Sequence, residues 1–189
     1  MKNIYLIVGR SGSGKTTIAE ALEGKYSLKS IQSYTTKPKR NENETGHIFV
    51  SDVEFDALTD MVAYTEFNEF RYCATTKQVE THDLYVIDPN GVKYFFDHYK
   101  GNKKAKVIYI DASVLTCFDR MEKRGISNGK EPIMATVEAL ERISNDNHEF
   151  YDYIHGIEMP DFIVLNNEIT IDEAVDRIIN YINKEESNA

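Results

Sequence analysis

The stretch Gly9-Arg10-Ser11-Gly12-Ser13-Gly14-Lys15-Thr16 joins an apolar run to a helical pattern, and this junction decides the fold. The run before it, Ile4–Val8, is continuously apolar, which is typical of a buried strand in a parallel sheet. The residues after it, from Thr16 to Leu22, have helical spacing. The glycines between them allow the backbone to curl tightly. The sequence therefore predicts a strand, a tight turn and a helix, in that order.

The same stretch fits the P-loop pattern G-x-x-x-x-G-K-[ST] at every fixed position. In such a loop the backbone N–H groups point at phosphate oxygens, and the start of the helix adds partial positive charge. We expect Lys15 to reach the β- and γ-phosphates and the Thr16 hydroxyl to ligate Mg²⁺. The alternative is an ordinary strand-to-helix turn rich in Gly and Ser, but the flanking strand and helix favour a site for a nucleoside triphosphate with Mg²⁺. The expected ATP-binding residues are Gly9, Arg10, Ser11, Gly12, Ser13, Gly14, Lys15, Thr16 and Thr17.

Strand-like and helical patterns alternate along the rest of the chain. Further apolar runs are Leu84–Ile87, Val107–Ile110 and Phe162–Leu165. Helical spacing from Val114 to Met121 is expected to end at Gly125, and Thr170–Glu173 has the pattern of a capping box that opens a last helix. This order predicts an α/β fold of the P-loop NTPase class, with a parallel-sheet core flanked by helices.

Two polar segments interrupt the alternation and lie on the expected ligand side of the sheet. The first, about 33–81, predicts a small insertion that binds a ligand, with a short helix opened by the capping box at Ser51–Glu54. The second, about 125–132, predicts a short lid. We expect a single domain over 1–189, whose core comprises 1–32, 82–124 and 133–185.

Composition excludes several function classes. The chain has 189 residues and a formal net charge of −9, which argues against a general nucleic-acid or anionic-membrane binder. Cys73 and Cys117 suit neither a disulfide framework nor a zinc site, so two reduced thiols are expected. No run approaches the roughly 20 apolar residues of a membrane helix, and the N-terminus lacks a signal-peptide pattern. We expect a soluble, cytoplasmic protein with small-molecule partners, and a frayed polar tail over Lys184–Ala189.

Several segments resemble those of guanylate kinases, in the same order along the chain. Ser33-Tyr34-Thr35-Thr36-Lys37-Pro38-Lys39-Arg40 and Glu44-Thr45-Gly46-His47-Ile48-Phe49-Val50-Ser51 are similar to the family's S-x-T-T-R-x-P-R…G-E…G…Y-x-F-V segment. Later matches are Glu66 with Tyr72, Asp88-Pro89-Asn90-Gly91-Val92-Lys93, Arg120 to Gly125, Arg142, and Asp161 to Asn167. The resemblance covers nearly the whole chain and implies phosphoryl transfer from ATP to the phosphate of GMP or dGMP.

The resemblance also assigns roles to individual residues. The implied catalytic residues are Lys15, Arg40, Arg124 and Arg142, with Arg120 a weaker candidate. The implied acceptor-binding residues are Ser33, Lys37, Arg40, His47, Glu66, Tyr72 and Asp88. Because the acceptor phosphate is already an anion, the chemistry needs aligned positive charge rather than a general base. Glu66, or second Asp88, would read the guanine N–H donors, and Asp88 alternatively serves the metal through water.

The chain departs from the family pattern mainly on the acceptor side. Lys37 replaces an Arg, His47 replaces a Tyr, and Cys73-Ala74 replaces Gly-[Ser/Thr] after Tyr72. Two other functions therefore stay open. One is a non-catalytic binding module with this fold, and the other is a P-loop kinase for a different small acceptor, with Asp88 as general base.

Overall fold

Four parallel strands form the central sheet of the computed structural model, in the order β6-β1-β7-β8. They are β1 (Asn3–Val8), β6 (Leu84–Val86), β7 (Lys104–Asp111) and β8 (Phe162–Leu165). The structure describes residues 1–39, 42, 44–67, 69–156 and 160–188. Each apolar run that predicted a strand contributes to this sheet, which confirms the expected α/β P-loop fold. The expected burial of the run Phe162–Leu165 is wrong, because β8 is an edge strand in which Ile163 and Leu165 are exposed.

Helices cover both faces of this sheet because the side chains of β1 alternate between them. Ile7 packs into a core beneath α1 (Lys15–Tyr26) and α7 (Ile171–Asn188). Leu6 faces the opposite core, which includes apolar side chains of α4 (Pro89–His98). Every residue of β1 is buried, as expected for a central strand covered on both sides.

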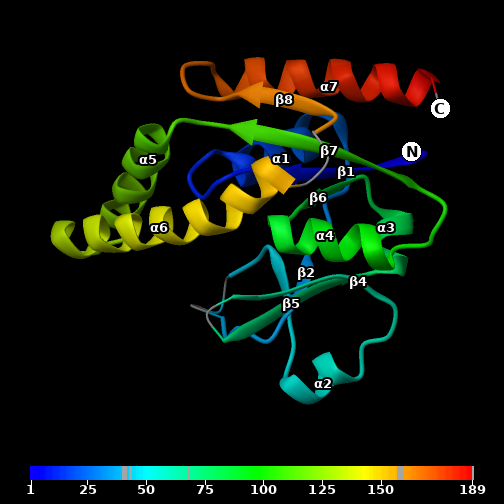
Figure 1. Ribbon diagram of the computed structural model, residues 1–189, viewed down its shortest axis with the longest axis horizontal. Helices are drawn as coiled ribbons and strands as arrows, with labels where there is room; N and C mark the ends of the chain where they lie inside the picture. The colour runs from blue at the N-terminus through cyan, green and yellow to red at the C-terminus, as the bar shows by residue number, and fades with distance from the viewer. Residues whose placement is uncertain (40–41, 43, 68, 157–159, 189) are drawn as a thin grey trace.

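A second sheet forms within the predicted insertion, in the order β3-β2-β5-β4. Its strands are β2 (Ser33–Thr35), β3 (His47–Phe49), β4 (Met61–Phe67) and β5 (Phe70–Thr75). The short helices α2 (Asp52–Asp56) and α3 (Thr76–Thr81) follow β3 and β5, and the capping box predicted at Ser51 is present. Val62 and Ala74 of this sheet join the core that contains Leu6. Figure 1 shows this sheet and the parallel sheet on either side of α4.

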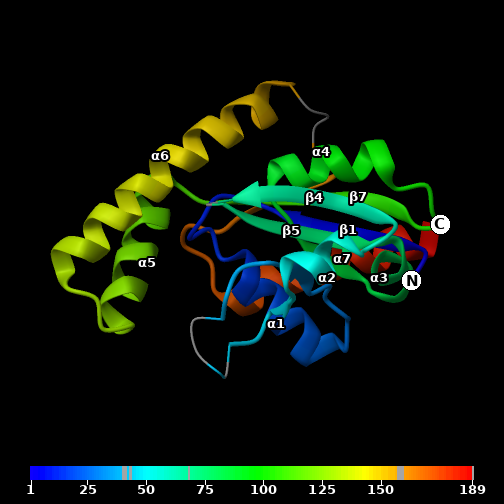
Figure 2. The same ribbon diagram turned by 90° about the horizontal axis from the view of Figure 1, so that it is seen from below.

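The helices α5 (Val114–Ser127) and α6 (Pro132–Gly156) form a hairpin that extends away from both sheets (Figures 1 and 2). The predicted helix end at Gly125 is wrong, because α5 continues to Ser127 and Gly129 adopts the left-handed conformation after it, with φ of 83°. Gly125 instead lies where the helices meet, since a Cβ there would stand 2.9 Å from the Ala135 Cβ. The connection between the helices is therefore shorter than the predicted lid of 125–132.

Three smaller expectations concern the chain ends, the thiols and the membrane. The tail does not fray as far as Asn188, because the Glu186 carboxylate accepts hydrogen bonds from the Lys2 N–H at 2.8 Å and the Asn3 Nδ2 at 2.8 Å. Cys73 and Cys117 are free and buried, as predicted. Among the residues that the structure describes, no helix combines the length and the apolar character needed to cross a membrane.

Candidate functional site

The P-loop follows β1 at the carboxyl edge of the parallel sheet and leads into α1. Gly12 and Gly14 have φ of 78° and 100°, which L side chains rarely adopt. A Cβ on Gly12 would stand 2.5 Å from the Cys117 carbonyl oxygen, and one on Gly14 would stand 2.5 Å from the Asn166 Nδ2. These glycines are therefore required both by the curl of the loop and by the elements packed behind it.

Lys15 lies at the first position of α1 with its ammonium beside the loop. Its Nζ donates to the carbonyl oxygens of Gly9 and Arg10, the latter at 2.9 Å. Burial lowers the pKa of Lys15 to about 8, and the nearby Asp146 carboxylate opposes that shift. The positive charge of Lys15 therefore lies in a buried place, where an opposite charge nearby stabilises it most.

Arg120 and Asn166 hold the outer side of the loop. The Arg120 guanidinium donates to the carbonyl oxygens of Gly12 and Ser13, at 3.4 and 3.3 Å, and to that of Asn166 at 2.9 Å. The Asn166 Nδ2 donates to the same Ser13 oxygen at 2.6 Å. Both side chains are therefore placed to hold the backbone of the loop in its conformation. The sequence did not predict this role for Arg120 or for Asn166.

The remaining predicted ATP-binding residues belong to the loop itself or to the first turn of α1. Thr16 and Thr17 are exposed in the first turn of α1, whereas Ser13 is buried. The Arg10 guanidinium bonds to the Asn147 Oδ1 at 2.5 Å. The loop thus presents its backbone and the Thr16 hydroxyl on one side while its other side is packed against the protein.

A cavity of about 330 Å³ connects the P-loop to the second sheet. The predicted site residues that line it are Gly9, Ser11, Lys15, Ser33, Lys37, His47, Tyr72, Asp88 and Arg142. They come from the P-loop, β2, the segment after it, β3, β5, the start of α4, and α6. The fold therefore gathers into one space residues that are more than 130 positions apart in the sequence.

On the side of the second sheet, several hydroxyl and charged groups line the cavity. The Ser33 hydroxyl bonds to the Tyr85 hydroxyl at 3.0 Å, deep in the cavity wall. The Lys37 ammonium lies 3.3 Å from the Glu44 carboxylate. The rings of His47 and Tyr72 meet edge to face, with centroids 5.6 Å apart. These groups can donate hydrogen bonds to an anionic or polar molecule.

Asp88 forms the floor between the two sides, because it is the N-cap of α4 directly after the strand β6. Its carboxylate accepts the Gly91 N–H at 2.7 Å and a hydrogen bond from the Thr65 side chain. Burial raises the pKa of Asp88, and these hydrogen bonds oppose the shift. A carboxylate in this position can accept N–H or O–H donors from a bound molecule.

The third wall is one face of α6, where Arg142, Asp146 and Glu149 follow the helical spacing i, i+4, i+7. The Arg142 Nε donates to the Ser11 Oγ at 2.9 Å, and its guanidinium lies 4.2 Å from the centre of the Phe67 ring. Burial, together with the charges of Asp88 and Asp146, raises the pKa of Glu149. The sequence prediction included Arg142 but missed both carboxylates, although their spacing from Arg142 was a usable signal.

Two of the described residues that were predicted as catalytic or acceptor-binding, Glu66 and Arg124, do not line this cavity. Glu66 is exposed on one face of β4, whereas Thr65 lies on the other face, and the Glu66 carboxylate accepts a hydrogen bond from the Tyr64 hydroxyl. This position does not fit the predicted role of Glu66 in recognising a nucleotide base. The reason is strand alternation, which turns Thr65 and Phe67 inward instead. Arg124 is exposed in the last turn of α5. Arg40 lies outside the described residues.

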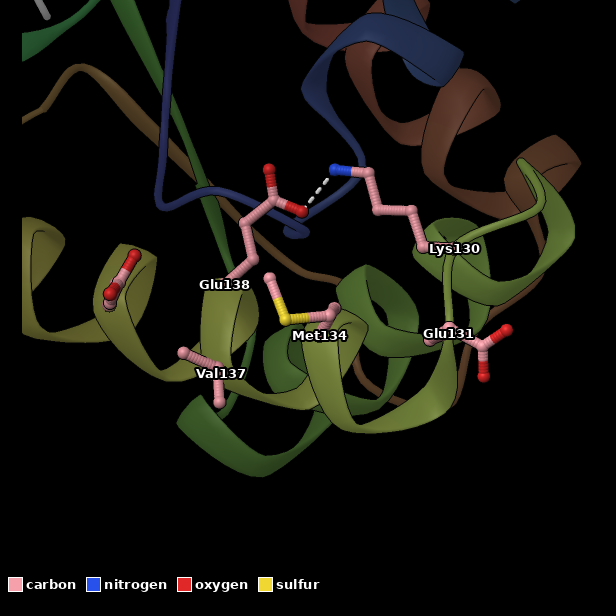
Figure 3. A pocket seen from close by; sticks show the side chains of 6 residues that line it. Lys130, Glu131, Met134, Val137 and Glu138 are labelled. Carbon is pink, nitrogen blue, oxygen red and sulfur yellow. Dashed lines mark hydrogen bonds and ion pairs between the residues drawn. The ribbon is translucent and has the colours of Figure 1, made fainter.

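A second hollow lies at the tip of the hairpin, where the connection after α5 leads into the first part of α6 (Figure 3). It is lined by Lys130, Glu131, Met134, Val137, Glu138 and Glu141. Lys130 and Glu138 pair across it, and Met134 is exposed. The hollow has none of the convergent donors and perturbed groups that mark the P-loop cavity, so the P-loop cavity is the candidate site.

A parallel sheet whose first strand leads through a P-loop into a helix defines the P-loop NTPase fold. The AAA domain family model AAA_18 matches residues 6–149, and the chain belongs to this family. No curated protein matches the chain.

Two solved structures support the fold. The crystal structure of guanylate kinase from Anaplasma phagocytophilum has 16% identity and a TM-score of 0.58, covering 97% of this chain and 86% of that one. The crystal structure of an uncharacterized protein from Eubacterium ventriosum ATCC 27560 has 14% identity and a TM-score of 0.52, covering 97% of this chain and 99% of that one. At these identities the likeness shows a shared fold.

Proposed function

We propose that this protein transfers a phosphoryl group from ATP to the phosphate of a nucleoside monophosphate, with GMP or dGMP as the preferred acceptor. One observation carries the proposal: a single cavity contains both the P-loop lysine, Lys15, and the donor groups of the second sheet. Such a space brings a donor nucleotide and an acceptor into contact, which phosphoryl transfer requires.

The charges around the cavity support an anionic acceptor. Three cations line the cavity: Lys15 of the P-loop, Lys37 of the segment after β2, and Arg142 of α6. In the proposed reaction these cations neutralise the charge of the transferring group and align the two phosphates. Arg40 and Arg124 are proposed to add to this charge from the loop after β2 and from α5.

Recognition of the base is assigned to Asp88 rather than to Glu66. Guanine presents its N1–H and N2–H₂ groups side by side, and a carboxylate accepts such a pair of donors. Asp88 lines the cavity and is oriented by Gly91 and Thr65, whereas Glu66 is exposed. Thr65 lies next to it on the cavity wall and is proposed to contact the same base.

The residues near the P-loop fit a magnesium ion held chiefly by nucleotide phosphates. The Thr16 hydroxyl is exposed at the start of α1, and the cavity carboxylates are hard oxygen donors of the kind Mg²⁺ prefers. Among the described residues no group of three or more His, Cys, Asp or Glu is arranged to hold a metal by itself. When bound with ATP, Mg²⁺ supplies charge neutralisation of the phosphates.

A second candidate function is a P-loop kinase whose acceptor is a hydroxyl group. The observation that favours it is the raised pKa of Asp88, since a more basic carboxylate is a better general base. In that reaction Asp88 would take the proton of the attacking hydroxyl.

An acceptor panel tests both proposals. ADP release from Mg²⁺–ATP is followed by a coupled assay with GMP, dGMP, AMP, CMP, UMP and dTMP, and with a set of hydroxylated metabolites. We expect turnover that depends on an added monophosphate and is fastest with GMP or dGMP. Turnover with a hydroxyl acceptor alone would favour the second candidate, and ATP binding without turnover of any acceptor would indicate a binding module.

A further inference from the structure

Asp146 occupies hydrogen-bond donors of the P-loop. Its Oδ2 accepts the backbone N–H of Ser11 at 2.5 Å, and its Oδ1 accepts the Ser11 hydroxyl at 3.2 Å. The side chain is buried, with 6% of its surface exposed. Both carboxylate oxygens are thus committed to one residue of the loop.

The contact between Asp146 and Ser11 occupies a backbone N–H group of the kind that binds phosphate oxygens in a P-loop. The N–H groups of a P-loop are arranged to bind phosphate oxygens, and a carboxylate is the side chain that most resembles a phosphate in charge and acceptor geometry. A single N–H cannot fully serve two anions, and two anions in one low-dielectric space repel. A phosphate at the Ser11 N–H therefore requires Asp146 to leave it.

Neighbouring contacts hold Asp146 in this place. One turn before it, the Arg142 Nε donates to the Ser11 Oγ at 2.9 Å. One residue after it, the Asn147 Oδ1 accepts a hydrogen bond from Arg10 at 2.5 Å. The contact is therefore part of a continuous packing of α6 against residues 10 and 11 of the loop.

The position of the contact indicates which phosphate it affects. Ser11 and Lys15 both line the cavity that also contains the donor groups of the second sheet. In a P-loop the lysine reaches the β- and γ-phosphates, so this edge of the loop is the one nearest the terminal phosphate.

We propose that Asp146 is an internal competitor for the phosphate-binding donors of the P-loop, acting against the terminal phosphate of the nucleotide. The inference rests on the proposed function only in requiring that the loop binds nucleotides. Asp146 lowers the affinity for ATP more than for ADP, and for ADP more than for AMP, because the repulsion grows with the number of phosphates that approach the loop edge.

Calorimetric titration of ATP, ADP and AMP in the presence of Mg²⁺ tests this, with Asp146→Asn as the variant. Asparagine keeps the size of the side chain and an oxygen that can accept the Ser11 N–H, but it removes the charge. Glu141→Gln is the matched control, since Glu141 lies on the same helix and is exposed. Circular dichroism establishes that each variant is folded, and Asp146→Ala provides a second removal of the charge.

We expect Asp146→Asn to bind ATP about tenfold or more tightly than the unmodified protein, since like-charge contacts cost several kcal/mol and 1.4 kcal/mol is a factor of ten. The gain should shrink from ATP to ADP to AMP, with Glu141→Gln unchanged. Equal or weaker ATP binding by folded Asp146→Asn and Asp146→Ala overturns the inference, because the carboxylate would then be neutral to the bound nucleotide or assist it. If the unmodified protein and every variant fail to bind ATP, the proposed function fails as well, whereas normal ATP binding with no gain refutes the inference alone.

Discussion

On one side of the cavity the P-loop presents backbone groups, while on the other side the second sheet presents side chains. The loop is held from behind by Arg120 and Asn166, which bond to its carbonyl oxygens rather than to anything in the cavity. The wall on the side of the second sheet is instead lined by side chains such as Ser33, Lys37 and Thr65. A wall made of backbone changes little when single residues change, whereas a wall made of side chains changes with each substitution. The comparison explains how one chain can keep a complete P-loop and depart from the guanylate kinase pattern on the acceptor side.

The largest effect is expected from Lys15→Ala, which removes the main functional side chain of the backbone wall. We expect turnover to fall by about 1,000-fold or more, because electrostatic stabilisation of the transferring phosphoryl group is lost. The coupled assay measures this, and thermal unfolding should show an intact fold, since burial already disfavours the Lys15 charge. If the variant kept more than about a tenth of the activity, the P-loop backbone would suffice for phosphoryl transfer without Lys15.

Asp88 lines the cavity but belongs neither to the P-loop nor to the second sheet, and we expect Asp88→Asn to have an intermediate effect on activity. Asparagine also caps helices, so α4 should persist. With GMP we expect a fall of about 10-fold to 100-fold in kcat/KM, mainly through KM, because one charge-assisted acceptor for the base is lost. Equal losses with every monophosphate would show that Asp88 serves the phosphates or the metal rather than the base.

The pH dependence of the free energy of unfolding provides an independent test of the raised pKa of Asp88. Burial raises its pKa, so between the ordinary Asp value and the raised value the folded protein binds more protons than the unfolded chain. The contribution of Asp88 to stability therefore decreases as the pH rises through this window. Chemical unfolding at a series of pH values should show that decrease in the unmodified protein and a smaller one in Asp88→Asn.

The smallest effects should distinguish the two faces of β4. Thr65→Val keeps the shape of the side chain but removes the hydroxyl that bonds to Asp88, and we expect a several-fold rise in the KM for the acceptor. Glu66→Gln, on the exposed face, should change it by less than about twofold. Kinetics over a range of acceptor concentrations compare the pair. A larger effect from Glu66 would restore the interpretation that its sequence position suggested.

The sequence predicted the backbone wall far better than the side-chain wall, for physical reasons. A P-loop is a local pattern, and the strand and helix around it are adjacent in the chain, so Gly9 to Thr16 could be interpreted without tertiary information. The direction of Glu66 depends on the register of β4 against β5, which one residue of shift reverses. The spacing of Asp146 from Arg142 indicated a shared helix face, but not its contact with Ser11, which joins residues 135 positions apart. Gly125 was misjudged because its small size serves helix packing against Ala135 instead of a helix end.

The length of α6 gives its contact with the P-loop a mechanical consequence. From Asp146 to the first residue of the helix, Pro132, there are four turns, a span of about 21 Å at 1.5 Å per residue. A rotation of about 10° centred on Asp146 carries Pro132 through about 4 Å over that span. If α6 turned as a rigid rod about Asp146, the hairpin of α5 and α6 would act as a lever arm, and a displacement at Ser11 smaller than one atom would be magnified at its outer tip.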